Sequence, residues 1–191
     1  MTGDPASHPP RSDPRPGWRA FLGLSDEDLL AQCEVDRFRA SGPGGQKRNK
    51  TDSAVRLRHR PTGLESVAVE SRSQHENRAR ALRRLRLTIA LHAREPIDPA
   101  SLEAYAPSEA IAGRRRGQRI EIATKNPAYP EVVAEVFDVI EAHGWRLSDA
   151  APALGLSTAA LSRFLEGDPA VFRAANERRA ALGLGLLRPG R

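Results

Sequence analysis

The 191-residue chain is poor in cysteine, in aromatic residues and in long apolar runs. Its one cysteine, Cys33, excludes an intramolecular disulfide framework and is expected to be a small core residue in a reducing compartment. No stretch approaches the roughly 18 consecutive apolar residues of a membrane span, and the N-terminus lacks the apolar core of a secretory signal. We therefore expect a cytoplasmic protein with no membrane partner.

Motifs that usually carry metal or covalent chemistry are also missing from the sequence. It contains no cluster of metal-ligating residues at the usual spacings and no convincing catalytic triad. We therefore predict no metal site and no cofactor.

Hydrophobic residues make up 39% of the chain, which is enough for one core domain and a small second one. Residues 1–24 are rich in proline, glycine, serine, aspartate and arginine, so we predict a flexible leader there. Its prolines and aspartates argue against an organellar transit peptide.

Positive charge is concentrated in one part of the chain. The formal net charge is +6, but residues 37–94 hold 15 lysines and arginines against four acidic residues, so this segment carries +11 and the rest −5. Clustered positive charge binds a phosphate backbone more tightly, because each neutralised phosphate releases condensed counterions. We therefore expect this segment to contact nucleic acid.

Within the basic segment, Gly44, Gly45 and Gln46 form a glycine hinge that carries one amide and is flanked by cations. Two adjacent glycines allow the main chain to approach a ligand closely, and Pro43 stiffens the entry. By itself the tripeptide is weak evidence, since it could simply be a tight turn with an exposed glutamine. The neighbouring segments of the sequence decide between a ligand-binding loop and a simple turn.

The segments 41–46, 49–57, 59–63 and 72–82 agree in order and spacing with one known family. This part of the chain, roughly residues 33 to 94, resembles the catalytic domain of class I peptide chain release factors and of stand-alone ribosome-rescue hydrolases. The resemblance implies hydrolysis of the ester between peptide and tRNA in the peptidyl-transferase centre. The implied partners are the large ribosomal subunit with its 23S rRNA, and peptidyl-tRNA.

The resemblance also implies catalytic roles for Gly44, Gly45 and Gln46. Water is the nucleophile, and the backbone N–H of Gln46 is the candidate donor to the developing oxyanion, while the two glycines supply the backbone shape. The Gln46 side chain would orient water and exclude bulkier nucleophiles. Because family members are often methylated on this side-chain amide, the same modification of Gln46 is a hypothesis here.

Further residues are candidates for RNA or ribosome contact, and all but one are cationic. They are Arg39, Lys47, Arg48, Asn49, Lys50, Arg72, Arg78 and Arg80. Lys47 and Arg48 replace a less basic pair of the usual family pattern. The extra charge could strengthen RNA contact or change how the loop settles in the catalytic centre, so the efficiency of hydrolysis is left open. Arg72, His75, Asn77 and Arg78 match family positions, although capping and surface solvation would explain each of them nearly as well.

The expected fold class is α+β for residues 25–94. Ser25 is predicted to cap a short helix that runs to about Gln32, and an extended strand follows over residues 33–39. Val55, Leu57 and His59 alternate with arginines, which predicts a half-buried strand. Residues 60–63 form a turn, and Val67 and Val69 continue the period in a return strand.

A helix is predicted to follow this hairpin and cover it. Ser73 and Glu76 stand at capping-box spacing and open the helix. An apolar stripe along it is formed by Ala79, Leu82, Leu85 and Ile89, and the other face carries Arg80, Arg83 and Arg84. The predicted unit is therefore a compact catalytic domain with its glycine loop at one end.

The remaining residues are predicted to form a basic linker (95–126) and a small all-α domain (127–187). The linker contains a short strand or helix and the arginines 114–116 and 119, which either touch RNA or are solvated. The first helix of the domain starts near Pro130 and ends around Gly144.

The rest of this domain is predicted to resemble a helix-turn-helix. Ser148 opens its first helix, Gly155 and Leu156 make the turn, and Ser157 starts its second helix. Asp168 caps a last helix that includes Leu182.

The preferred function is codon-independent release from stalled ribosomes or split large subunits, because nothing before Cys33 is expected to form a stop-codon reader. The stalled state would then be recognised through a protein partner docked on the helical domain, through large-subunit RNA, or through peptidyl-tRNA on a split subunit. The second alternative is a non-hydrolytic regulator that uses the helix-turn-helix to bind DNA, and it is disfavoured because residues 157–165 offer few groups for base or phosphate contact. The third alternative is a ribosome-binding factor without hydrolysis.

Overall fold

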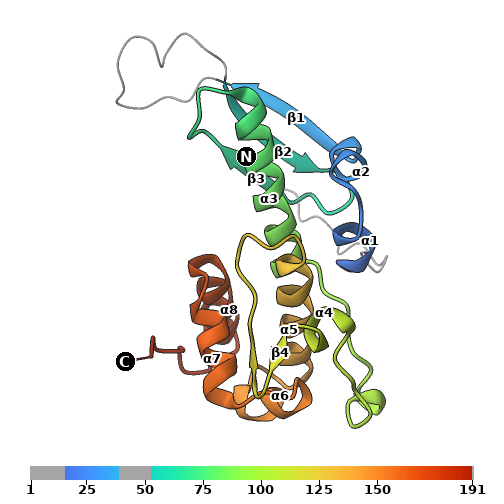
Figure 1. The fold of residues 1–191 in the computed structure, drawn as a ribbon, viewed down its shortest axis with the longest axis vertical. Helices are drawn as coiled ribbons and strands as arrows, with labels where there is room; N and C mark the ends of the chain where they lie inside the picture. The colour runs from blue at the N-terminus through green and yellow to red at the C-terminus, as the bar shows by residue number, and fades with distance from the viewer. Residues whose placement is uncertain (1–15, 39–52, 191) are drawn as a thin grey trace, which may run out of the picture.

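The computed structural model describes residues 16–38 and 53–190. A three-stranded antiparallel sheet lies at one end and a group of helices at the other, and the long helix α3 (Gln74–His92) runs from the sheet towards the helices (Figure 1). This mixture of helices and antiparallel strands agrees with the predicted α+β class. In the part of the chain so described, no helix is both long and apolar enough to cross a bilayer.

The sheet pairs β1 (Cys33–Phe38), β2 (Ala54–His59) and β3 (Glu65–Ala68) in that order, with neighbours antiparallel. In β2, the residues at positions 55, 57 and 59 are buried, and the arginines between them are exposed. The predicted half-buried strand is therefore confirmed. Gly63 closes the turn to β3 at φ 71°, a backbone angle that favours glycine.

The return strand has its buried face one residue away from the prediction. Ser66 and Ala68 are buried, whereas Val67 is 37% exposed and Val69 lies beyond the end of the strand. The reason is that α3 packs closely against β3, so only small side chains fit between them. The Ser66 hydroxyl donates to the Ala81 carbonyl at 2.8 Å, so a polar side chain is satisfied at this contact.

Helix α3 is capped as predicted, because the Ser73 hydroxyl accepts from the Glu76 N–H at 3.4 Å. Its buried face consists of Asn77, Ala81, Leu82, Leu85, Ile89 and Ala90. Ala79 was predicted to belong to this face but is exposed. It stands two residues from both Asn77 and Ala81, about 200° around the helix, so it points the other way.

Two short helices precede the sheet. In α2 (Asp26–Ala31), the Ser25 side chain accepts from the Asp28 N–H, which confirms the predicted cap. The helix α1 (Arg19–Leu22) lies within the segment predicted to be a flexible leader.

For residues 18–22 the leader prediction is wrong, because Trp18, Phe21 and Leu22 are each about 95% buried. These three apolar residues are enough to anchor a segment that otherwise has a leader-like composition. Residues 1–15 lie outside the described part.

The segment predicted to be a basic linker has more structure than expected. It contains the 3-10 helix η2 (Pro99–Ser101), the helix α4 (Glu109–Ala112) and a two-stranded ribbon of β4 (Arg115–Arg116) and β5 (Arg119–Ile120). Ile111 is fully buried, so the segment packs against the rest of the protein.

Four helices complete the chain: α5 (Tyr129–Ala142), α6 (Leu147–Ala153), α7 (Thr158–Glu166) and α8 (Pro169–Ala181). Helix α5 is buried on nearly all sides, because α1, α3, α4 and α6 all pack against it.

The ends of these helices test the predicted caps and turn. The side chains of Ser157 and Asp168 cap α7 and α8 as predicted, and Gly155 makes the turn between α6 and α7 at φ 67°. Helix α6 starts one residue before the predicted Ser148. Leu182 was placed inside the last helix, but it follows α8 and is 48% exposed.

One continuous core joins the sheet region to the C-terminal helices. At the junction, the buried Asp138 carboxylate of α5 accepts from the Trp18 indole N–H at 2.5 Å and from the Glu95 N–H at 3.2 Å. It also pairs with the Arg94 guanidinium at 3.1 Å. Burial raises the pKa of Asp138 to about 6, against these donors, so the carboxylate is charged at neutral pH.

Candidate functional site

The glycine motif belongs to the segment that joins β1 to β2. Phe38 and Ala54 are paired residues of the two strands, so the segment leaves and re-enters the sheet at the same end. Gly44, Gly45 and Gln46 lie outside the described residues, and so do the predicted contact residues Arg39, Lys47, Arg48, Asn49 and Lys50. What the structure describes is the frame from which this segment starts.

Asn77 holds that frame together. Its side-chain N–H groups donate to the Ser53 carbonyl at 2.6 Å and to the Ser71 carbonyl at 2.8 Å. Its side-chain oxygen accepts from the Ser71 N–H at 2.9 Å. Asn77 is fully buried, and its amide satisfies one backbone group where the loop re-enters the sheet and two in the β3–α3 connection.

This role was not predicted, since the match of Asn77 to a family position was balanced against simple capping. A signal was present in the sequence. Asn77 stands four and eight residues before the buried Ala81 and Leu85, so it lies on the core face of α3. A polar residue on an apolar helix face requires partners, and here the partners are the loop root and the β3–α3 connection.

Arginines surround the same end of the sheet. Arg72 and Arg78 are exposed, and Arg80 is partly exposed and pairs with Glu76 at 3.5 Å. The Arg56 guanidinium lies 5.3 Å from the centre of the Phe38 ring, beside the start of the loop. Three of the predicted contact residues therefore lie at the start of α3, with Arg72 just before the helix and Arg78 and Arg80 in its N-terminal half.

Among the described residues, no carboxylate lies within 4.0 Å of Arg72 or Arg78. Arg84, by contrast, forms an ion pair with Glu70 and donates to the Val67 carbonyl at 2.5 Å. Arg84 is thus fixed to the edge of the sheet, whereas the charges of Arg72 and Arg78 are available to a ligand.

His59, at the opposite end of β2, has a structural role. Its Nδ1 lies 2.8 Å from the Thr62 hydroxyl and its Nε2 lies 3.0 Å from the side-chain oxygen of Gln32. The Phe21 ring packs edge-on against it at 4.6 Å. Burial lowers the pKa of His59, so the ring is neutral at pH 7 and links α1, α2 and the hairpin turn.

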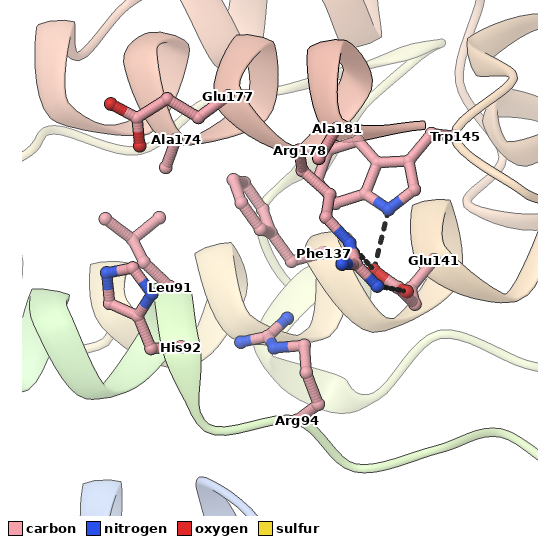
Figure 2. A pocket seen from close by; sticks show the side chains of 10 residues that line it. All are labelled: Leu91, His92, Arg94, Phe137, Glu141, Trp145, Ala174, Glu177, Arg178 and Ala181. Atoms are coloured by element: carbon pink, nitrogen blue, oxygen red, sulfur yellow. Dashed lines mark hydrogen bonds and ion pairs between the residues drawn. The ribbon is translucent and has the colours of Figure 1, made fainter. Parts of the chain in front are cut away.

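A hollow of about 390 Å³ lies where the end of α3 meets α5 and α8 (Figure 2). On one side, Glu141 accepts from the Trp145 indole N–H at 2.6 Å and pairs with Arg178, which fastens α8 to α5. His92 and Arg94 extend from the other side (Figure 2). Acids and bases are mixed around the apolar Phe137, so the hollow has no single charge that would select a ligand.

No group of three or more histidine, cysteine, aspartate or glutamate residues able to hold a metal occurs within residues 16–38 and 53–190.

The sheet, the helix across it and the basic surface at the loop root define a compact α+β module that presents one loop from its end. A family model, the RF-1 domain, matches residues 28–128. The match covers more than half of the chain, so the chain belongs to the RF-1 domain family.

Curated relatives of the chain include peptide chain release factor 1 of several bacteria. The chain is 44% identical over 97 residues to peptide chain release factor 1 of Brachyspira hyodysenteriae, across 51% of this chain and 25% of that protein. It is 42% identical over 106 residues to peptide chain release factor 1 of Albidiferax ferrireducens, across 53% of this chain and 28% of that protein. The chain thus spans about a quarter of the length of these relatives.

The family match ends immediately before α5. It includes the segment 95–126, which was predicted to lie outside the catalytic domain. The C-terminal helices α5 to α8 therefore lie beyond the matched region.

Proposed function

We propose that this protein hydrolyses the ester between peptide and tRNA in the peptidyl-transferase centre and acts without a stop codon. Its targets would be stalled ribosomes or split large subunits that hold peptidyl-tRNA. The observation that carries the proposal is the intact Gly44, Gly45 and Gln46 sequence inside the region that matches the RF-1 domain.

The chemistry needs a fixed donor more than it needs a nucleophilic side chain. Water attacks the ester carbonyl, and negative charge develops on the carbonyl oxygen and on the leaving ribose oxygen. The Gln46 N–H would stabilise this charge, because a backbone donor already aimed at the oxygen requires little reorganisation. The Gln46 side chain would position the water, and Gly44 and Gly45 would let the backbone reach the ester.

The clamp around Asn77 supports this mechanism. A catalytic N–H must be held in place, and the hydrogen bonds of Asn77 tie Ser53, where the loop returns to the sheet, to Ser71 in the β3–α3 connection. Asn77 would then be a positioning residue. Methylation of the Gln46 side chain is also part of the proposal, and the intact mass of protein from its native host tests it.

The proposed ligand of the basic surface is 23S rRNA, with the acceptor end of the tRNA beside it. Arg72, Arg78 and Arg80 on the described surface would meet phosphates. The cationic loop residues Arg39, Lys47, Arg48 and Lys50 would do the same, and Asn49 would add a polar contact. Together these charges would make ribosome binding strongly dependent on salt.

The C-terminal helices fit a docking role better than a DNA-reading role. On α7, the Ser162 hydroxyl donates to Glu166 at 3.0 Å and is therefore already engaged. Arg163 is the single cationic residue of this helix and is exposed. The start of α7 is also joined to the β4–β5 ribbon, because the Ser157 N–H donates to the Gln118 carbonyl at 3.2 Å. Contact with a protein partner or with large-subunit RNA is therefore preferred over DNA.

The test is release of labelled peptide from ribosomes that hold peptidyl-tRNA. Four complexes are compared: no codon, a stop codon or a sense codon in the A site, and isolated large subunits. Release without a stop codon that Gly45→Val abolishes would support a rescue hydrolase, and the preferred complex would identify its target. Release from the stop-codon complex alone would contradict codon independence, and release from none of them would contradict hydrolysis.

A further inference from the structure

A groove of about 410 Å³ lies between α3 and the segment that leads into α5. We call it the α3–α5 groove. One side belongs to the region that matches the RF-1 domain, and the other includes the first residues of the C-terminal helices. Its lining consists of Arg80, Arg83, Arg84, Arg86, Leu87, Thr124, Lys125, Pro127, Tyr129, Pro130 and Asp168.

Five of these residues are cationic and one is acidic. Arg84 and Arg86 are held by Glu70 and by Asp26, which are not part of the lining. Arg83 and Lys125 are exposed, and no carboxylate of the described residues lies within 4.0 Å of either.

The acid of the lining, Asp168, is already engaged. It accepts from the Ala170 N–H at 2.8 Å and from the Val171 N–H at 3.5 Å as the cap of α8. The free charges of the groove are therefore positive, and they come from both of its sides.

Tyr129 adds an observation of another kind. The residue is 3% exposed, and its hydroxyl has no hydrogen-bond partner among the described residues. A buried polar group without a partner is costly, so it indicates a missing ligand or water. Tyr129 lines this groove and also an adjoining hollow of about 220 Å³ with Arg119 and Arg163.

The hydroxyl is buried at the wall of the groove and carries a proton that it could donate. Burial and the nearby charge of Asp168 raise the pKa of Tyr129, so it keeps its proton at any physiological pH. Its ring lies 6.2 Å from the Phe164 ring, and this contact holds the tyrosine in place.

We propose that the α3–α5 groove binds the phosphate backbone of an RNA strand, with Arg83, Lys125 and the Tyr129 hydroxyl as donors. Guanidinium groups match phosphate oxygens in geometry and charge, and a neutral hydroxyl adds a hydrogen bond that a purely electrostatic surface lacks. The choice of RNA over an acidic peptide rests on the proposed function, which brings the protein onto the ribosome. The groove also continues the arginine-bearing face of α3 away from the glycine loop.

The proposal assigns the C-terminal helices a role in RNA binding. Lys125 precedes α5 and Tyr129 is its first residue, so the position of α5 against α3 sets the width of the groove. The C-terminal helices would extend the RNA-binding surface rather than form a separate reader.

The test uses the full-length protein and a fluorescein-labelled single-stranded RNA of about 12 nucleotides, with binding followed by anisotropy across a salt series. Arg83→Gln/Lys125→Gln should weaken binding about tenfold and should reduce the slope of log K against log salt by about one to two. The matched control is Arg146→Gln/Arg173→Gln, which removes two exposed charges outside the groove and should reduce binding much less.

Tyr129→Phe is the second variant, because it removes only the hydroxyl. It should weaken RNA binding at least about twofold while the melting temperature stays the same or rises, since the free protein loses an unpaired buried group. Unchanged affinity in either groove variant, or an equal loss in the control, would overturn the proposal. Weaker binding of an oligo-glutamate peptide by these variants, with RNA affinity unchanged, would identify a protein ligand instead.

Failure of this proposal and failure of the proposed function are distinguishable. RNA affinity is measured without catalysis, so the groove is tested even if no complex releases peptide. Conversely, Gly45→Val should lose peptide release but keep wild-type affinity for the RNA probe. A groove variant should instead release peptide at the wild-type maximal rate but require a higher protein concentration.

Discussion

The sheet region and the C-terminal helices use their residues in opposite ways. The sheet buries mainly one face, its edge strand β3 buries only a serine and an alanine, and arginines stand on its surface. In α5, by contrast, Tyr129 and every residue from Val132 to Ile140 are buried. The first region therefore presents surface for a ligand, and the second supplies much of the hydrophobic core.

The difference shows why the two regions are joined by buried polar contacts. A helix that is buried all round has no free face for its carboxylates, so Glu135 and Asp138 must find partners inside the protein. Glu135 accepts from the Tyr105 hydroxyl at 2.6 Å and from the Ser108 N–H at 2.7 Å. Both carboxylates thus bind segments that precede α5, so we expect the two regions to unfold together rather than as separate domains.

The largest expected effect on stability comes from breaking this junction at Asp138. Asp138→Ala should cost about 3 kcal/mol of unfolding free energy, because Arg94 is left in a largely buried place without its partner. Urea unfolding followed by circular dichroism measures the change. Glu131→Ala on the same helix is the control and should cost less than about 1 kcal/mol. Two separate transitions in wild type would contradict the shared core.

A slightly smaller loss is expected at the loop root, where Asn77→Ala leaves three part-buried backbone groups of Ser53 and Ser71 without their partner. We expect about 2–3 kcal/mol of destabilisation and a lower maximal rate of peptide release at a temperature where the variant is folded. The exposed neighbour His75 gives the control His75→Ala, which should change neither quantity. A normal release rate in folded Asn77→Ala would show that the clamp serves stability alone.

The pH dependence of stability should be visible at His59. Because burial lowers its pKa below the unfolded value of about 6.5, the unfolded chain takes up the proton first. Stability from the neutral ring is complete above about pH 6.5 and is lost as pH falls towards the folded-state pKa.

The comparison with His59→Phe isolates this effect. The stability advantage of wild type should shrink between about pH 7.5 and pH 5.5, by at most about 1.4 kcal/mol. The titration of Asp138 contributes equally to the stability of both proteins, so it cancels in the difference. An advantage that is independent of pH would show that His59 is not buried as described.

The smallest stability effect is expected on the basic surface. Arg72→Ala/Arg78→Ala should change unfolding free energy by less than about 0.5 kcal/mol for each residue, because both side chains are exposed. Ribosome binding should nevertheless weaken, and the salt slope should fall by about one for each phosphate that the variant no longer binds. Wild-type binding at all salt concentrations would remove these arginines from the interface.

Local patterns predicted much of the fold. The caps at Ser25, Ser73 and Ser157, the half-buried β2 and the helix after Pro130 all depend on residues close in sequence, and all are confirmed. The failures depend on contacts far apart in sequence. The buried face of β3 is set by α3.

Burial of Trp18 likewise depends on a hydrogen bond to Asp138, 120 residues away. The candidate site divides in the same way. The glycine motif and its flanking cations are visible in the sequence, but they lie outside the described residues and remain predictions. The clamp of Asn77 and the α3–α5 groove require the three-dimensional arrangement, because their parts come from separate segments.

Single-turnover peptide release at saturating protein, on ribosomes with peptidyl-tRNA and an empty A site, tests the central claim most directly. Wild type should release the peptide, and Gly45→Val should slow release by about 10²–10³ or more while still binding the ribosome, because the backbone donor at Gln46 is displaced. Release at the same rate by both proteins, or no release by wild type at saturation, would contradict the account.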